Sequence, residues 1–166
     1  GALTDALPLA AQRRIRRVFL THAHFDHIAS LPLLMENLYG LASPLEILAP
    51  PAVLSVIARD VLNDRIWPDF TKLPSRARPT VRLRPLLENR PFRAGAVFFT
   101  PFAVSHVVPA YGYIVAKPGR SMTIDTYGWT TAAGTLYAHY YRGTTLLKSV
   151  RAGTGVGAAG DDEPGV

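Results

Sequence analysis

The chain has 166 residues, which is typical of one domain, and 48% of them are hydrophobic, which excludes a globally disordered protein. It contains no cysteine, so disulfides, a cysteine nucleophile and thiolate metal sites are excluded. The formal net charge is +6, which favours anionic partners, and part of it is concentrated at residues 13–17. The chain shows neither an apolar run of about 18 residues nor a signal-peptide pattern, so we expect a cytoplasmic protein without a membrane partner.

The first predicted elements are a strand and a helix. Residues 15–20 end in an apolar run that predicts a strand, which we expect to be central in its sheet. Residues 28–39 predict a helix, and its buried face is expected to consist of Leu31, Leu34, Met35 and Leu38. Pro32 is tolerated in the first turn of this helix, where its missing N–H is not needed, and Gly40 is a natural stop.

The rest of the chain continues to alternate between strand and helix patterns. Residues 45–48 predict a strand and residues 52–62 a second helix. Further strand patterns lie at residues 81–84, 96–99, 104–115 and 121–125, with interruptions at Pro101 and Pro109. This alternation predicts an α/β fold over residues 1–150. Residues 151–166 are mostly Gly, Ala, Asp and Glu and are expected to be a disordered tail.

The most informative stretch is a histidine-rich cluster, Thr-His-Ala-His-Phe-Asp-His, at residues 21–27. Imidazole and carboxylate ligands suit zinc, iron or manganese. Alternate residues of an extended segment point the same way, so His22 and His24 can reach one metal together. Asp26 and His27 lie where the chain turns into the next helix and can face a second metal nearby. Ligand sites in α/β folds concentrate at the carboxyl ends of strands, which is where this cluster lies.

This HxHxDH pattern after an apolar strand resembles the signature of the metallo-β-lactamase fold. The longer string THAHFDHIASLPLLMENLYG, residues 21–40, resembles the class II cyclic-nucleotide phosphodiesterases, with Phe25 in place of that family's usual leucine. The string RIWPDFTKLP, residues 65–74, is also similar to that family. The resemblance covers roughly residues 13–126 and implies an αββα sandwich, of which this chain carries a partial copy.

The resemblance also implies a set of metal ligands. His106, in Val-Ser-His-Val-Val-Pro, matches the family's third histidine and is expected to complete the first metal site with His22 and His24. Asp125 takes the place of a carboxylate that bridges the two metals, although Ile124 and Tyr127 replace the small residues usual in that turn. Two divalent metals are implied, with zinc expected and manganese or iron as alternatives.

The implied activity is hydrolysis of a 3′,5′-cyclic nucleotide, such as cyclic AMP, to the nucleoside 5′-monophosphate. Two metals would activate a water for attack on phosphorus, and Asp26 would orient that water. The family's final histidine ligand has no counterpart in this chain, because the only histidine after Asp125 is His139, in an unrelated context. We therefore expect this chain alone to be weak or inactive.

Three other functions compete with this hypothesis. One is a different hydrolase on the same fold, acting on RNA, a thioester or a lactam, because a fold does not fix a function. Another is a catalytically inactive metal-binding domain. The third, which the sequence favours least, is a basic nucleic-acid-binding module, because the chain lacks the motifs of such modules.

Overall fold

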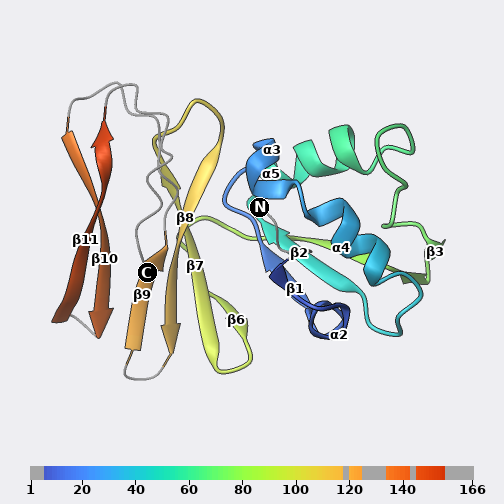
Figure 1. The fold of residues 1–166 in the computed structure, drawn as a ribbon, viewed down its shortest axis with the longest axis horizontal. Helices are drawn as coiled ribbons and strands as arrows, with labels where there is room; N and C mark the ends of the chain where they lie inside the picture. The colour runs from blue at the N-terminus through green and yellow to red at the C-terminus, as the bar shows by residue number, and fades with distance from the viewer. Residues whose placement is uncertain (1–5, 118–119, 125–133, 143–144, 156–166) are drawn as a thin grey trace. The chain divides into compact units, whose positions relative to one another are not determined.

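The computed structural model describes residues 6–117, 120–124, 134–142 and 145–155. The chain divides into two compact units, Gly1–Leu86 and Leu87–Val166, shown in Figure 1. The predicted domain over residues 1–150 takes in all of the first unit and most of the second, and its boundary stays a prediction.

The first unit is built on a parallel three-stranded sheet in the order β1-β2-β5. Its strands are β1 (Arg17–Phe19), β2 (Leu45–Ala49) and β5 (Val81–Pro85). The expectation that the strand within residues 15–20 is central is wrong, because β1 lies at the edge and β2 in the middle. Strand β2 is buried along almost its whole length, as a strand covered on both faces must be, whereas Arg17 of β1 is exposed.

Two helices replace the single helix predicted at residues 28–39. They are α3 (Phe25–Ile28) and α4 (Leu31–Asn37), separated by a turn. Pro32 lies in the first turn of α4, where a proline can begin a helix but cannot extend one from the preceding segment. The predicted buried face is confirmed, since Leu31, Leu34, Met35 and Leu38 are each no more than 5% exposed. Gly40 follows with φ at 74°, the left-handed conformation that favours glycine after a helix.

The remaining elements of the first unit are short. The helix predicted at residues 52–62 consists of α5 (Pro51–Val56) and a following π-helical turn, η1 (Ile57–Val61). A four-residue helix, α2 (Leu9–Gln12), precedes β1, and β3 (Pro74–Ser75) pairs with β4 (Arg78–Pro79). Within the described part of the chain, no helix is long and apolar enough to cross a membrane.

The second unit contains an antiparallel six-stranded sheet in the order β11-β10-β9-β8-β7-β6. Its strands are β6 (Phe92–Ala94), β7 (Val97–Val104), β8 (Ala110–Lys117), β9 (Arg120–Ile124), β10 (Gly134–Arg142) and β11 (Thr145–Gly155). Strand β11 includes residues 151–155 of the segment expected to be a tail, and residues 156–166 lie outside the described ranges.

Pro101 was expected to interrupt the strand pattern, but β7 runs through it without a break. Pairing with β6 ends at Phe99, and beyond it the Pro101 carbonyl accepts a hydrogen bond from the backbone N–H of Asn89 at 2.8 Å. The nitrogen and carbonyl of one strand residue point to the same side, so the missing N–H of Pro101 faces away from β8 and removes no bond from that pairing.

Candidate metal centre

His22 begins the candidate centre immediately beyond the carboxyl end of β1. Pairing of this strand extends to Leu20, whose N–H donates to the carbonyl of Leu48 at 3.0 Å, so the chain leaves the sheet from a fixed point. The His22 side chain is buried, with only 1% exposed. Its Nδ1 lies 3.1 Å from the hydroxyl oxygen of Thr21, which orients the ring.

Three histidine rings gather at this point of the first unit. The centroid of the His22 ring lies 4.8 Å from that of His24 and 4.1 Å from that of His27. His24 has the extended backbone conformation that the HxH alternation predicts, with φ −63° and ψ 146°. The carbonyl of His24 then accepts the N–H of His27 at 3.0 Å, which starts α3 and turns the third ring back toward the first.

Asp26 lies on the exposed side of this cluster. Its side chain is 77% exposed, and Oδ2 lies 3.2 Å from Nε2 of His27. The pair offers one oxygen and one nitrogen donor side by side, which are the donor types that zinc, manganese and iron accept. A metal bound by both groups would replace their mutual contact.

His106, the predicted third ligand, belongs to the second unit, where it follows the end of β7 by two residues. The prediction that it stands at a strand end is confirmed. Its Nδ1 accepts a hydrogen bond from the backbone N–H of Val107 at 2.8 Å. In this arrangement a neutral ring carries its proton on Nε2, so metal binding by His106 requires that hydrogen bond to be released or the ring to rotate.

The structure does not place Asp125 or His139 at the histidine cluster. Asp125 lies outside the described residues. His139 is part of β10, which pairs with β11. Thr21 and Phe25 were not predicted to have a role, yet Thr21 contacts the His22 ring and the exposed Phe25 follows His24 directly in the chain. For Thr21, the sequence offered one indication of such a role, which is its position directly before the strand-end histidine His22.

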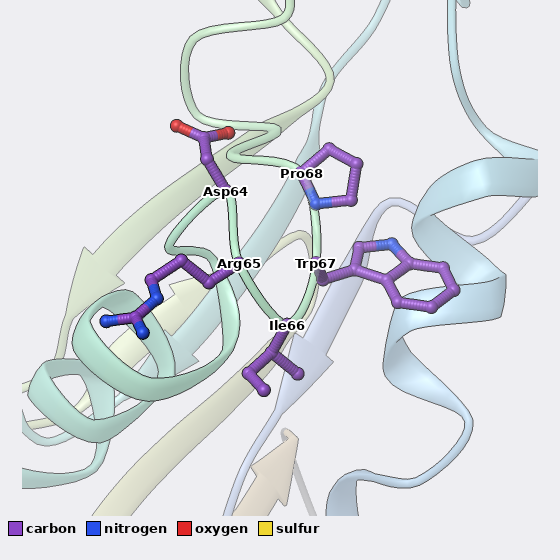
Figure 2. A pocket seen from close by; sticks show the side chains of 5 residues that line it. All are labelled: Asp64, Arg65, Ile66, Trp67 and Pro68. Carbon is purple, nitrogen blue, oxygen red and sulfur yellow. The ribbon is translucent and has the colours of Figure 1, made fainter.

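The segment at residues 63–68, which overlaps the start of the phosphodiesterase-like string at residues 65–74, folds into a tight loop that borders a shallow pocket (Figure 2). The side-chain oxygen of Asn63 accepts the N–H groups of Arg65 and Ile66 at 3.0 and 2.8 Å. The indole N–H of Trp67 is buried without a hydrogen-bond partner in the described structure. The pocket is lined by Asp64, Arg65, Ile66, Trp67 and Pro68. It offers one carboxylate and no histidine, so we place the candidate metal centre at the histidines.

An ion pair between the exposed Lys72 and the buried Asp69 follows this loop. Lys72 lies 2.6 Å from the carboxylate of Asp69, which also accepts a hydrogen bond from the hydroxyl of Thr71. Burial alone raises the pKa of Asp69, but the hydrogen bonds from Lys72 and Thr71 outweigh it and leave that pKa below its ordinary value. The Asp69 carboxylate is thus held by its own neighbours, which fits a structural role.

Comparison with protein families and curated proteins gives one consistent result. Residues 2–148 match the family described as "Beta-lactamase superfamily domain". Ribonuclease BN of Cronobacter sakazakii is 24% identical over 142 residues, which are 82% of this chain and 44% of that protein. Ribonuclease Z of Pyrococcus abyssi is 34% identical over 119 residues, which are 68% of this chain and 34% of that protein.

Solved structures agree on the fold. Unliganded yeast PDE1 matches with a TM-score of 0.63 and 24% identity, over 72% of this chain and 36% of that one. The metallo-beta-lactamase fold protein YhfI from Bacillus subtilis matches with a TM-score of 0.52 and 20% identity, over 73% of this chain and 43% of that one. The predicted fold class is confirmed, and the chain spans less than half the length of each of these four proteins.

Proposed function

Because the chain belongs to the beta-lactamase superfamily, we propose that it is part of a metal-dependent hydrolase that cleaves phosphodiester bonds. The observation that carries this proposal is the gathering of the His24 and His27 rings around buried His22, with the Asp26 carboxylate beside them. Such a mixture of imidazole and carboxylate donors fits a divalent metal.

His22, His24 and His106 are the proposed ligands of a first metal, since each offers one ring nitrogen. Asp26 and His27 are proposed for a second metal, with Asp125 as the bridging carboxylate. Two divalent cations bound there would supply Lewis-acid stabilisation of charge on the phosphoryl group and a water of lowered pKa. Asp26 is proposed to orient the attacking water, and its exposure at the edge of the cluster supports this role.

The proposed substrate is a 3′,5′-cyclic nucleotide, opened to the 5′-monophosphate. Its support is the likeness of residues 21–40 and 65–74 to the class II cyclic-nucleotide phosphodiesterases. RNA is a second candidate, because the two curated relatives described above are named ribonucleases. Both substrates contain a phosphodiester, so the same chemistry at the metals serves either.

A substrate comparison tests the proposal. The longer natural protein and this chain are each assayed with zinc or manganese on cyclic AMP and on a precursor transfer RNA, with His24→Ala as the inactive control. We expect the longer protein to hydrolyse cyclic AMP and this chain to be weak, because no final histidine ligand follows Asp125 in a matching context. Cleavage of RNA alone would replace the first substrate by the second. Hydrolysis of neither would refute the phosphodiesterase proposal.

A further inference from the structure

Phe25 is the most exposed aromatic side chain in the part of the chain whose burial is described. It is 77% exposed, compared with 49% for Tyr39 and 38% for Phe98. Large apolar side chains such as Leu34 lie in the core, where burial stabilises the fold, whereas a few others, such as Ile66 and Val107, are exposed at 70% and 73%. A phenylalanine in water lacks this stabilisation, so its position calls for a reason other than packing.

The position of Phe25 is set by the candidate metal ligands on either side of it. It is the first residue of α3, between the extended residue His24 and the exposed carboxylate of Asp26. Ile28 is 7% exposed and anchors the other end of this short helix in the core. The spacing of Phe25 and Ile28 would place both on one face of a longer helix, yet only Ile28 is buried. The ring therefore stands in solvent at the metal-binding segment (α3 in Figure 1).

The chemistry of the ring limits what it can contact in a substrate. Phe25 has no group that could bind a metal, a phosphate or a sugar hydroxyl, and it offers only a flat π face. A phosphodiester substrate made of nucleotides has one flat, weakly polar part, which is the nucleobase. Stacking of bases on aromatic side chains is a general mode of nucleotide binding and tolerates any base, since each has a π face.

Building on the proposed function, we infer that Phe25 is a substrate-binding residue on which the nucleobase next to the scissile phosphodiester stacks. In the proposed function the reacting phosphate would lie at the metals, and two of their candidate ligands, His24 and Asp26, are the chain neighbours of Phe25. The base is shared by a cyclic nucleotide and by an RNA strand, so this role of Phe25 serves both candidate substrates.

The test compares two ligands that differ only by a base, adenosine 5′-monophosphate and ribose 5-phosphate. Their dissociation constants are measured by calorimetry with zinc present, for the unaltered chain, Phe25→Leu and Phe25→Trp. We expect Phe25→Leu to weaken the adenosine ligand by about 5- to 150-fold and to leave ribose 5-phosphate unchanged. Phe25→Trp keeps a π face and should retain the binding of the adenosine ligand.

Two further measurements separate stacking from other effects. The adenine H2 and H8 protons should shift upfield on binding to the unaltered chain, through the ring current of Phe25, and this shift should vanish in Phe25→Leu. Tyr39→Leu removes another partly exposed ring and should change neither dissociation constant. The same titrations with cyclic AMP and with a short oligoribonucleotide show whether the chain binds a cyclic nucleotide or RNA more tightly.

The possible outcomes distinguish the stacking role of Phe25 from the proposed phosphodiesterase function on which it rests. If both phosphate ligands bind and Phe25→Leu weakens them equally or not at all, the stacking role is refuted while the phosphodiesterase proposal stands. If the unaltered chain binds ribose 5-phosphate but gains nothing from the base, or binds neither ligand with zinc present, the stacking role is refuted, and the phosphodiesterase proposal is decided by the substrate comparison described above. Circular dichroism of each variant establishes that the fold is intact, and Phe25→Met, which also lacks a π face, repeats the test if Phe25→Leu fails to fold.

Discussion

At the scale of single residues, the contact between Thr21 and His22 decides which ring nitrogen of His22 can face a metal. The hydroxyl oxygen of Thr21 lies 3.1 Å from Nδ1. When Nδ1 carries the proton and donates it to this oxygen, Nε2 keeps a free lone pair and can serve as a ligand. Partners of this kind fix both the tautomer and the orientation of a metal-binding histidine.

Thr21→Val removes the hydroxyl and keeps the branched shape of the side chain. We expect the affinity for zinc to fall by about 10- to 100-fold, the usual effect of losing such a partner. Competition with a chelator of known affinity measures the change. Thr71→Val, which removes another threonine hydroxyl from the first unit, is the control and should bind zinc as the unaltered chain does. An unchanged affinity in Thr21→Val would show that the contact does not orient the ring.

The sequence predicted the histidines of the site but not the groups that support them. The HxH alternation and the apolar run before it depend only on local geometry, so the pairing of His22 with His24 could be predicted. The exposure of Phe25 could not, because its spacing to Ile28 is that of a buried helix face. Exposure depends on what covers a side chain in three dimensions, and the sequence pattern holds no information on it.

At the scale of elements, α4 shows how closely a helix follows its apolar spacing. Leu34 and Leu33 are adjacent in the chain, yet Leu34 is 1% exposed and Leu33 is 50% exposed. The predicted face was correct, whereas the predicted start was not, since a proline decides where a helix can begin. The edge position of β1 was missed for a different reason: strand order depends on pairing between distant segments, which no local pattern encodes.

Leu34→Ala should destabilise the protein by about 2–5 kcal/mol, because it leaves a cavity in a fully packed core. Leu33→Ala removes the same atoms from the same helix and should change the free energy of unfolding by less than about 0.5 kcal/mol. Urea unfolding followed by circular dichroism measures both. Similar losses of stability in the two variants would contradict the assignment of the buried face.

At the scale of the whole molecule, the net charge is +6, and exposed arginines of the first unit contribute to it. Arg13, Arg14 and Arg16 are exposed, and within the described residues none of them pairs with a carboxylate, since Arg13 and Arg16 donate to backbone carbonyls. Arg17 differs from them, because Glu46 lies 2.7 Å from its guanidinium. The basic cluster therefore acts as three positive charges available to an anionic partner.

Binding of a single-stranded oligoribonucleotide should weaken as salt rises, because contacts between arginine and phosphate release counterions. Replacing Arg13, Arg14 and Arg16 by glutamine should reduce the slope of log affinity against log salt by about 2, at about 0.7 for each lost contact. Arg59→Gln is the control, since that guanidinium is already paired with Asp60. Fluorescence anisotropy at several salt concentrations gives the slopes. Equal slopes in the triple variant and the unaltered chain would exclude the cluster from RNA binding.

The parallel order of the first sheet has a consequence for how quickly the protein folds. Residues 20–44 separate β1 from β2 and residues 50–80 separate β2 from β5, whereas each strand of the antiparallel sheet pairs with its neighbour in sequence. Closing longer loops costs more entropy, so the hairpins of the second unit should form early, within about 1–10 μs for an isolated hairpin. The parallel sheet must wait for its long crossovers. The histidine cluster lies on the first of these crossovers, so we expect the candidate metal centre to become ordered only late in folding.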